Sequence, residues 1–258
     1  MVCINDIYDA IEANGFKEPT LQLIDKYIND IENGRANFSR FNEQEHAGLC
    51  KAGSAVIGAL IVASYARRSI TASSDAEGRQ GGPFNWEIDE RLEQMLEQWA
   101  RAAGLWFDNS DSILQKNFGP MIAQGAEAKV YYREGDPTVV KERTSIYSTT
   151  EKALDAIVLH NSLFPETAMN AFGFTRDSDH LFRVILTQPY VRCLRLATKA
   201  EIDFLVSEKG FHDNMDGQGV NYESDRLALE DMHPANVFID EVSSKAICID
   251  CIVKFKNY

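Results

Sequence analysis

Three polar side chains that could serve phosphate chemistry occur within residues 229–252. Asp231 and Asn236 are five residues apart around Pro234, and Asp250 follows after two strand-like segments, NVFID and KAICID. We expect these segments to form a hairpin that returns the chain, so that Asp250 faces the other two side chains. Two carboxylates and an amide can orient an acceptor hydroxyl and hold Mg²⁺ against phosphates, as phosphoryl transfer from ATP requires. Alternatively, Asp231 and Asn236 cap a turn.

A glycine turn and a lysine earlier in the chain carry groups suited to phosphate. Gly125, followed by Ala126 and Glu127, lies between strand-like segments. The absence of a Cβ at a glycine lets backbone N–H groups approach phosphate oxygens closely. Lys141 ends the segment TVVK, and its ammonium group is a compact charge able to reach the α- and β-phosphates. Taken alone, the glycine is consistent with an ordinary turn and the lysine with a solvated strand end.

Together these motifs resemble a known family. DMHPANVFID followed by ICID is similar to the catalytic loop and metal-binding segment of protein-kinase-like enzymes, D-x-x-x-x-N with a later Asp. QGAEAKVYY with VVKER resembles the small atypical kinases of the KEOPS tRNA-modification complex. From about residue 93 onward, the phrases AGLWF, LHNSLFPET, AFGF and TQPYV resemble kinase-like domains in polyvalent proteins of phages and conjugative elements.

The resemblance implies a role for each site residue. Asp231 would be the catalytic carboxylate, Asn236 and Asp250 the Mg²⁺ ligands, and Lys141 the lysine that pairs with the phosphates of ATP. It further implies that TQPYV contacts adenine. Pro189 has no N–H, so the pairing has to use the Gln188 carbonyl and the amide of Tyr190 or Val191. The alternative for this segment is a strand end terminated by proline.

The family pattern also implies a carboxylate on the following helix that pairs with Lys141. Glu151 is one candidate, but as the third residue after Ser148 it is suited to completing a helix cap. Asp155 lies one turn further into the helix, whereas Glu166 lies beyond the expected helix end. We therefore expect Asp155 to be the partner of Lys141.

The chain departs from the family pattern in ways that leave two functions open. Of the three glycines in the usual phosphate loop only Gly125 remains, with Ala123 and Ala128 at the other positions. Cys-Ile follows Asp250 in place of Phe-Gly, and we expect a second lobe reduced to little beyond the site. The first function is a phosphotransferase in which Asp231 orients an acceptor hydroxyl. The second is a pseudokinase, a nucleotide-binding or interaction module without phosphoryl transfer. For either function, the resemblance to polyvalent proteins implies a mobile-element context in a bacterium.

The elements that position these residues form an α+β protein. Apolar residues at helical spacing dominate the first hundred residues, and the pattern becomes extended after about residue 118. We expect a helical region over 1–68, a linker over 69–85, a helix over 86–118, a kinase-like N-lobe over 119–197 and a reduced C-lobe over 198–258. The helices of the N-terminal region should pack against the kinase-like part, because they carry apolar faces. Capping-box pairs predict three helix starts: Asn42 with Glu45, opening a helix through Ala66, Ser148 with Glu151, and Thr198 with Glu201.

The composition of the chain excludes some classes of binding partner. The 258 residues carry a formal net charge of −13, which argues against a general nucleic-acid or anionic-membrane surface. The phosphate motifs and the family resemblance imply a nucleotide and an unidentified acceptor or protein as partners. The most apolar run, residues 55–63, is too short to span a bilayer, and the N-terminal residues lack the pattern of a signal peptide. Five scattered cysteines fit a reducing cytoplasm.

Two further groups are weighed as metal ligands. Cys248 and Cys251 have CxxC spacing, but no second pair follows and Asp250 lies between them, so we expect neither a zinc site nor a redox pair. His160 lies in an apolar helix, where an imidazole is more often a satisfied core residue than a ligand.

Overall fold

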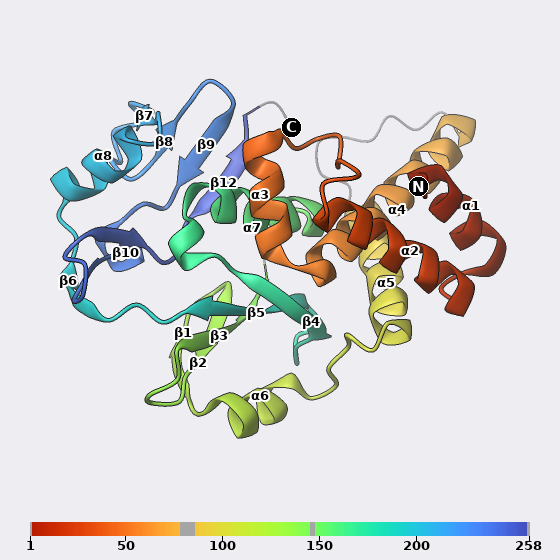
Figure 1. Ribbon diagram of the computed structural model, residues 1–258, viewed down its shortest axis with the longest axis horizontal. Helices are drawn as coiled ribbons and strands as arrows, with labels where there is room; N and C mark the ends of the chain where they lie inside the picture. Colours follow the sequence, from red (N-terminus) through yellow and green to blue (C-terminus); the bar gives the residue numbers. More distant parts are fainter. Residues whose placement is uncertain (1, 78–85, 145–147, 257–258) are drawn as a thin grey trace.

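The computed structural model describes residues 2–77, 86–144 and 148–256. Its first part is helical, as predicted. The helices are α1 (Ile4–Asn14), α2 (Glu18–Glu32), α3 (Glu43–Ala52), α4 (Ser54–Glu77), α5 (Trp86–Ala102) and α6 (Ser110–Phe118). Figure 1 shows α1, α2, α4 and α5 on the right and α6 at the bottom, below the strands. Helix α3 lies in front of a green helix, α7 (Thr150–Leu163), at the centre of the molecule.

The predicted helix from Asn42 through Ala66 is wrong in its length. Asn42 does cap α3, because its side chain accepts a hydrogen bond from the Glu45 N–H and the Glu45 side chain accepts one from the Asn42 N–H. The helix ends at Gly53, whose φ of 86° lies in the left-handed region that glycine adopts without a Cβ clash. The chain then bends by 112° into α4. Because α4 continues to Glu77, the first part of the predicted linker is helical, while residues 78–85 lie outside the described chain.

None of the described helices is individually long and apolar enough to cross a membrane; α3 and the first part of α4 pass such a test only as a bent pair.

In the second part of the chain, the described residues form three antiparallel sheets. A five-stranded sheet has the order β1-β2-β3-β5-β4, from β1 (Met121–Gln124), β2 (Ala128–Tyr131), β3 (Thr138–Arg143), β4 (Asn170–Arg176) and β5 (Phe182–Pro189). A second sheet, β11-β10-β6, contains β6 (Cys193–Leu196), β10 (Val237–Asp240) and β11 (Ala246–Cys248). The third, β12-β9-β8-β7, contains β7 (His212–Asp213), β8 (Tyr222–Glu223), β9 (Leu227–Glu230) and β12 (Ile252–Phe255). This mixed architecture is the predicted α+β class.

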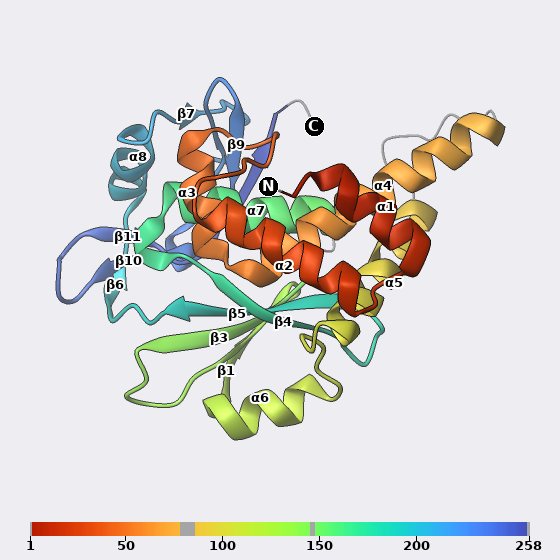
Figure 2. The same ribbon diagram turned by 45° about the vertical axis from the view of Figure 1, so that its right-hand side comes forward.

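The N-terminal helices and the five-stranded sheet share one hydrophobic core. Buried residues of this core come from α1 to α5, from α7 and from strands β4 and β5. The contact between α4 and α5 is close: a Cβ at Gly58 would lie 2.4 Å from the ring of Trp99. The predicted packing of the N-terminal helices on the kinase-like part is therefore confirmed (Figure 2).

A second core lies under the two smaller sheets. It includes Ile202 and Val206 of α8 (Lys199–Ser207), together with residues of β9 to β12. Leu159 and Leu163 of α7 belong to it, whereas Leu154 on the same helix belongs to the first core. Helix α7 thus connects the two cores, and its position affects both.

Candidate active-site cleft

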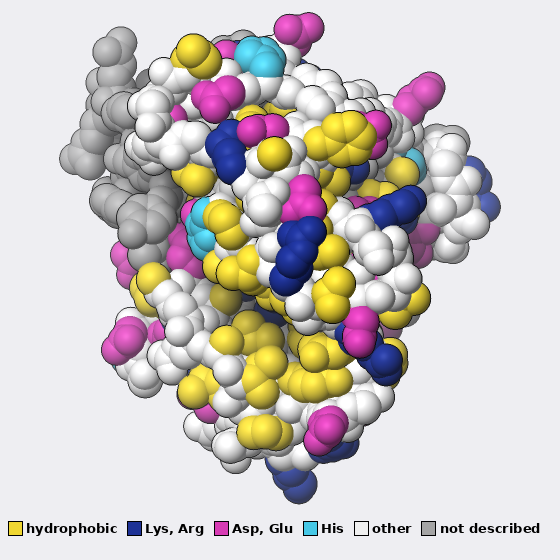
Figure 3. Space-filling view, turned by 90° about the vertical axis from the view of Figure 1, so that its left-hand side faces the viewer, with side chains coloured by type: hydrophobic (Ala, Val, Ile, Leu, Met, Phe, Trp, Pro, Cys, Tyr) yellow, Lys and Arg dark blue, Asp and Glu magenta, His cyan; other side chains and the backbone are white. Residues whose placement is uncertain are grey.

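One cleft of about 780 Å³ brings the predicted site residues together. Figure 3, which views the molecule from the side of β6 and α8, shows hydrophobic side chains gathered on this face above and below a hollow. The cleft lies between the five-stranded sheet and the smaller sheets, and its volume is typical of small-ligand sites. Its lining includes all but one of the predicted site residues: Gly125, Ala126, Glu127, Lys141, Gln188, Tyr190, Asp231, Asn236 and Asp250.

The loop after β9 holds Asp231 in an unusual backbone conformation. Its φ of 64° is left-handed, which is uncommon for a residue with a side chain. Several hydrogen bonds fix it there: the Asp231 N–H donates to the Asn221 side chain at 3.2 Å, and the His233 N–H donates to the Asp231 carbonyl at 2.9 Å. The Asn236 side chain donates to the same carbonyl at 2.9 Å and to the Asp231 carboxylate at 3.0 Å. Asp231 and Asn236 therefore form one rigid unit at the cleft.

The predicted hairpin brings Asp250 to the same cleft. Strands β10 and β11 pair antiparallel with Val237 opposite Cys248, and Asp250 lies two residues after the end of β11. Its carboxylate lies 3.2 Å from Nη1 of Arg143 and accepts a hydrogen bond from the Cys251 N–H at 3.0 Å. Burial raises the pKa of the Asp250 carboxyl, but the Arg143 and Lys141 charges outweigh it and hold the pKa well below its usual range. Asp250 is therefore a charged carboxylate at neutral pH.

The predicted pairing of Lys141 with Asp155 is wrong. Asp155 is the one predicted site residue that does not line the cleft. The Lys141 side chain is buried, donates to the Ile249 carbonyl at 2.9 Å and lies 3.6 Å from Oδ2 of Asp250. Asp155 instead forms an ion pair with Arg40 at 3.1 Å. The reason is that the acidic face of α7 packs against Arg40, in the loop before α3, and both of its carboxylates pair there.

The acidic face of α7 is neutralised by arginines of the N-terminal region. Glu151 lies 2.6 Å from Nη1 of Arg40 and 2.6 Å from Nη2 of Arg67. The predicted capping of α7 by Ser148 and Glu151 is wrong. The residue that caps this helix is Thr149, whose side chain accepts a hydrogen bond from the Lys152 N–H. The guanidinium of Arg40 also lies over the rings of Phe38 and Phe41. These contacts attach α7 firmly to the N-terminal helices.

The turn at Gly125 is compact and leaves room for a ligand. The Gly125 N–H donates to the Ala128 carbonyl at 2.8 Å, so this amide closes the turn. A Cβ at Gly125 would meet no atom of the described residues within 4 Å, and its φ does not lie in the left-handed region. Protein packing therefore does not require glycine here. The space beside it is available to a bound group.

The segment after β5 supports only part of the predicted adenine contact. The Tyr190 N–H donates to the Pro137 carbonyl at 2.9 Å, so the Tyr190 amide is engaged and the Val191 amide remains the candidate. The Tyr190 ring stacks on Tyr132, with centroids 4.3 Å apart. The buried Gln188 side chain donates to the carbonyls of Thr167 and Ile249, at 2.8 and 3.1 Å.

Arg143 and Asn221 contact the site but were missed by the sequence reasoning. Arg143 has a detectable signal: it lies two residues after Lys141 on a strand, so both side chains point to the same face. Asn221 has none, because it reaches Asp231 from a different loop.

The donor set in the cleft fits Mg²⁺. Asp250 offers carboxylate oxygens, and Asn236 offers its amide oxygen because its amide nitrogen donates to Asp231. Hard oxygen donors of this kind are those that Mg²⁺ prefers, with substrate phosphates and water filling the remaining positions.

Comparison with protein families gives a match. The sequence model of a family described as a serine/threonine/tyrosine kinase found in polyvalent proteins matches residues 89–257, more than half of the chain. No curated protein matches the sequence.

Proposed function

The chain belongs to the serine/threonine/tyrosine kinase family found in polyvalent proteins, and from this premise we propose that it transfers the γ-phosphoryl group of ATP to an acceptor hydroxyl. One observation carries the proposal: Lys141, Asp231, Asn236 and Asp250 line a single cleft of about 780 Å³. These side chains come from three separate segments of the chain, and phosphoryl transfer needs all of these types of group in one place.

Each residue has a defined part in the proposed reaction. The acceptor oxygen forms a bond to the γ-phosphorus while the bond from that phosphorus to its bridging oxygen breaks, and ADP leaves. Asp231 orients the acceptor hydroxyl and receives its proton. Lys141 binds the α- and β-phosphates, and Asn236 and Asp250 hold Mg²⁺. When bound, the cation neutralises charge that develops on the phosphate oxygens.

A second candidate is a pseudokinase, a nucleotide-binding module without transfer. The contact that favours it is the pairing of Lys141 with Asp250 and with the Ile249 carbonyl, which occupies the lysine within the protein. In addition, the acidic face of α7 is bound to Arg40 and Arg67. Phosphate binding would have to compete with Asp250 for the lysine.

Titration calorimetry and transfer from labelled ATP separate these candidates. Asp231→Asn should leave Mg-ATP affinity nearly unchanged and lower transfer by ~10²–10⁴-fold, the usual contribution of a positioned general base. Lys141→Met should weaken both. Asp250→Ala should erase the difference in ATP affinity between Mg²⁺ and EDTA. Asp225→Asn is the matched control, because it removes one exposed carboxylate outside the cleft lining.

The outcomes are distinct. Binding without transfer in the wild-type protein would favour the pseudokinase. Absence of ATP binding with and without Mg²⁺ would reject both candidates. Undiminished transfer in Asp231→Asn would show that this carboxylate is not the base.

A further inference from the structure

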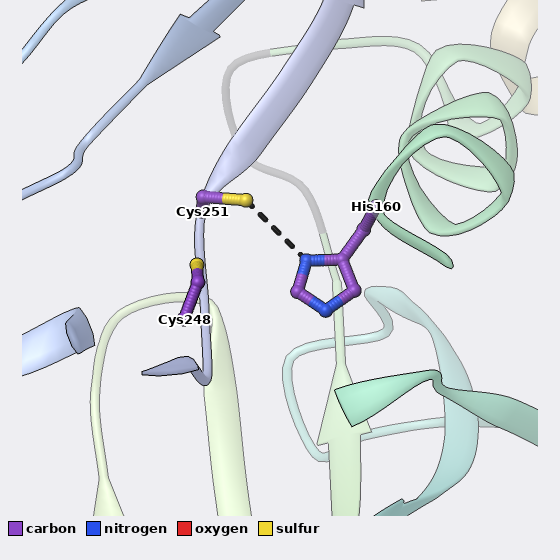
Figure 4. A group of neighbouring side chains, drawn as sticks. All are labelled: His160, Cys248 and Cys251. Atoms are coloured by element: carbon purple, nitrogen blue, oxygen red, sulfur yellow. Dashed lines mark hydrogen bonds between the residues drawn. The ribbon is translucent and has the colours of Figure 1, made fainter. Parts of the chain in front are cut away.

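Three side chains with soft or borderline metal-ligand atoms meet in the core behind the cleft. They are His160 of α7, Cys248 at the end of β11 and Cys251 before β12, and all three are buried. Their ligand atoms lie within 4.8 Å of one another. Figure 4 shows the Cys251 thiol directed toward the His160 ring, with Nδ1 of that ring 3.3 Å from Sγ. The imidazole comes from a helix 91 residues earlier, which is why CxxC spacing alone did not indicate it.

The His160 ring is oriented as a metal ligand would be. Its Nε2 lies 3.3 Å from the Thr167 carbonyl, so a proton on Nε2 leaves the Nδ1 lone pair directed at Cys251. Ligating histidines usually donate their other N–H to a carbonyl or carboxylate in this way. Thr167 also donates its hydroxyl to the Cys248 carbonyl at 2.6 Å. One residue therefore holds both the ring and the backbone of a thiol ligand.

The atoms around the group determine the class of cation. Sγ of Cys248 lies 3.8 Å from Sδ of Met232, which is buried as well. Sulfur and imidazole donors suit Zn²⁺, whereas the oxygen donors of the neighbouring cleft suit Mg²⁺. Two thiolates also neutralise a divalent cation, so the complex adds no net charge to an apolar core.

We propose that Cys248, Cys251 and His160 form a Zn²⁺ site, distinct from the nucleotide cleft. Two Zn–S bonds and one Zn–N bond form, a water molecule takes the fourth position, and the two thiol protons leave to solvent. Tetrahedral Zn²⁺, with Zn–S of about 2.3 Å and Zn–N of about 2.0 Å, places ligand atoms roughly 3.5–3.8 Å apart. The observed spacing therefore needs only small shifts. The ion joins α7 to the segment that carries Asp250.

Titration of the full chain with Co²⁺, under reducing and oxygen-free conditions, tests the site without any nucleotide. The wild type should bind about one equivalent, with a thiolate charge-transfer band that Zn²⁺ abolishes. Cys248→Ser and Cys251→Ser should each lose the band and weaken affinity by more than ~10²-fold, since even outer-shell changes cost ~10–100-fold. Cys50→Ser is the matched control, because that thiol also lies beside an imidazole, 3.7 Å from Nε2 of His46.

X-ray absorption of the Zn²⁺-loaded wild type identifies the ligands even if a variant fails to fold. Two sulfur neighbours and at least one nitrogen neighbour are expected. A shell of oxygen and nitrogen alone, no band at equimolar Co²⁺, or a band that survives in both cysteine variants would overturn the proposal. So would a Cys248–Cys251 disulfide in protein that binds no metal after reduction. Because ATP is absent throughout, failure here leaves the proposed kinase function untouched.

Discussion

The substitution Asp155→Asn tests whether Asp155 is a buried structural carboxyl beside Arg40, as the structure shows, or the partner of Lys141, as the sequence predicted. Asp155 is 3% exposed, and within the described chain neither of its oxygens has a hydrogen-bond donor, although Arg40 lies 3.1 Å away. A carboxyl in this position affects stability and its pH dependence. If it paired with Lys141 instead, the substitution would affect nucleotide binding.

The size of the pH effect follows from the pKa. Burial raises the pKa of Asp155 from 3.8 to about 7, and the Arg40 charge offsets only part of this. Between about pH 4 and pH 7 the folded state therefore binds more protons than the unfolded state, so the stability from this group falls as pH rises and levels off above that range. From pH 5 to pH 8 the loss is roughly 2.5 kcal/mol, at about 1.36 kcal/mol per pH unit.

Urea unfolding at pH 5 and pH 8 measures this effect. The wild type should lose more stability than Asp155→Asn over this interval, by roughly 2.5 kcal/mol, because asparagine does not titrate. Burial also raises the pKa of Asp89, to about 6. Asp89 titrates in both proteins, so its contribution cancels when their stability changes are compared. Asp177→Asn is the control. Burial raises the pKa of the Asp177 carboxyl, but hydrogen bonds, above all from Arg183, lower it below its usual value, so this carboxyl does not titrate between pH 5 and pH 8. The stability difference between pH 5 and pH 8 should therefore be the same in this variant as in the wild type.

Two results would refute this reasoning. One is a wild-type pH dependence that persists in Asp155→Asn. The other is a loss of Mg-ATP binding comparable to that of Lys141→Met, which would restore the predicted pairing of Asp155 with the lysine.

Two further predictions concern packing and acid stability. Gly48→Ala should lower the free energy of unfolding by about 1–3 kcal/mol, because the added Cβ would lie 2.3 Å from the Val158 carbonyl oxygen, where α3 crosses α7. Urea titration measures it, with Gly125→Ala as the neutral control, and an unchanged midpoint would contradict the close crossing. Arg143→Met should unfold at higher pH during acid titration followed by tryptophan fluorescence. The depressed pKa of Asp250 gives stability that is lost as pH falls, and Arg143 is its main cause. An unchanged acid profile would argue against that ion pair.

Local patterns predicted much of the fold and of the cleft. Asn42 with Glu45 and Thr198 with Glu201 form the predicted capping boxes, because a cap depends on residues three apart. The hairpin that returns Asp250 was predicted because alternating apolar residues and a short connection specify it locally.

Long-range contacts could not be predicted in the same way. The position of Asp155 on α7 was expected, but its direction depends on Arg40, which comes 115 residues earlier and whose role no local pattern reveals. The sequence left the amides of Tyr190 and Val191 as alternatives for the adenine contact, because the partner of the Tyr190 amide, the Pro137 carbonyl, comes from the distant turn before β3. Periodicity specifies which face a residue occupies, whereas tertiary packing decides what meets that face.

The ion pairs from Arg40 and Arg67 to α7 have a consequence for inheritance. A recombination event that transferred only residues 89–257 would separate Glu151 and Asp155 from both arginines. It would also uncover apolar residues of α7, such as Leu154, Ile157 and Val158, which share a core with the N-terminal helices, and each such side chain left exposed costs about 1.5–3 kcal/mol. A few of them equal the total stability of a typical domain. Selection should therefore remove such recombinants unless the recipient gene supplies helices that cover this face of α7. Lineages that carry this kinase segment should inherit the preceding helices with it as one genetic unit.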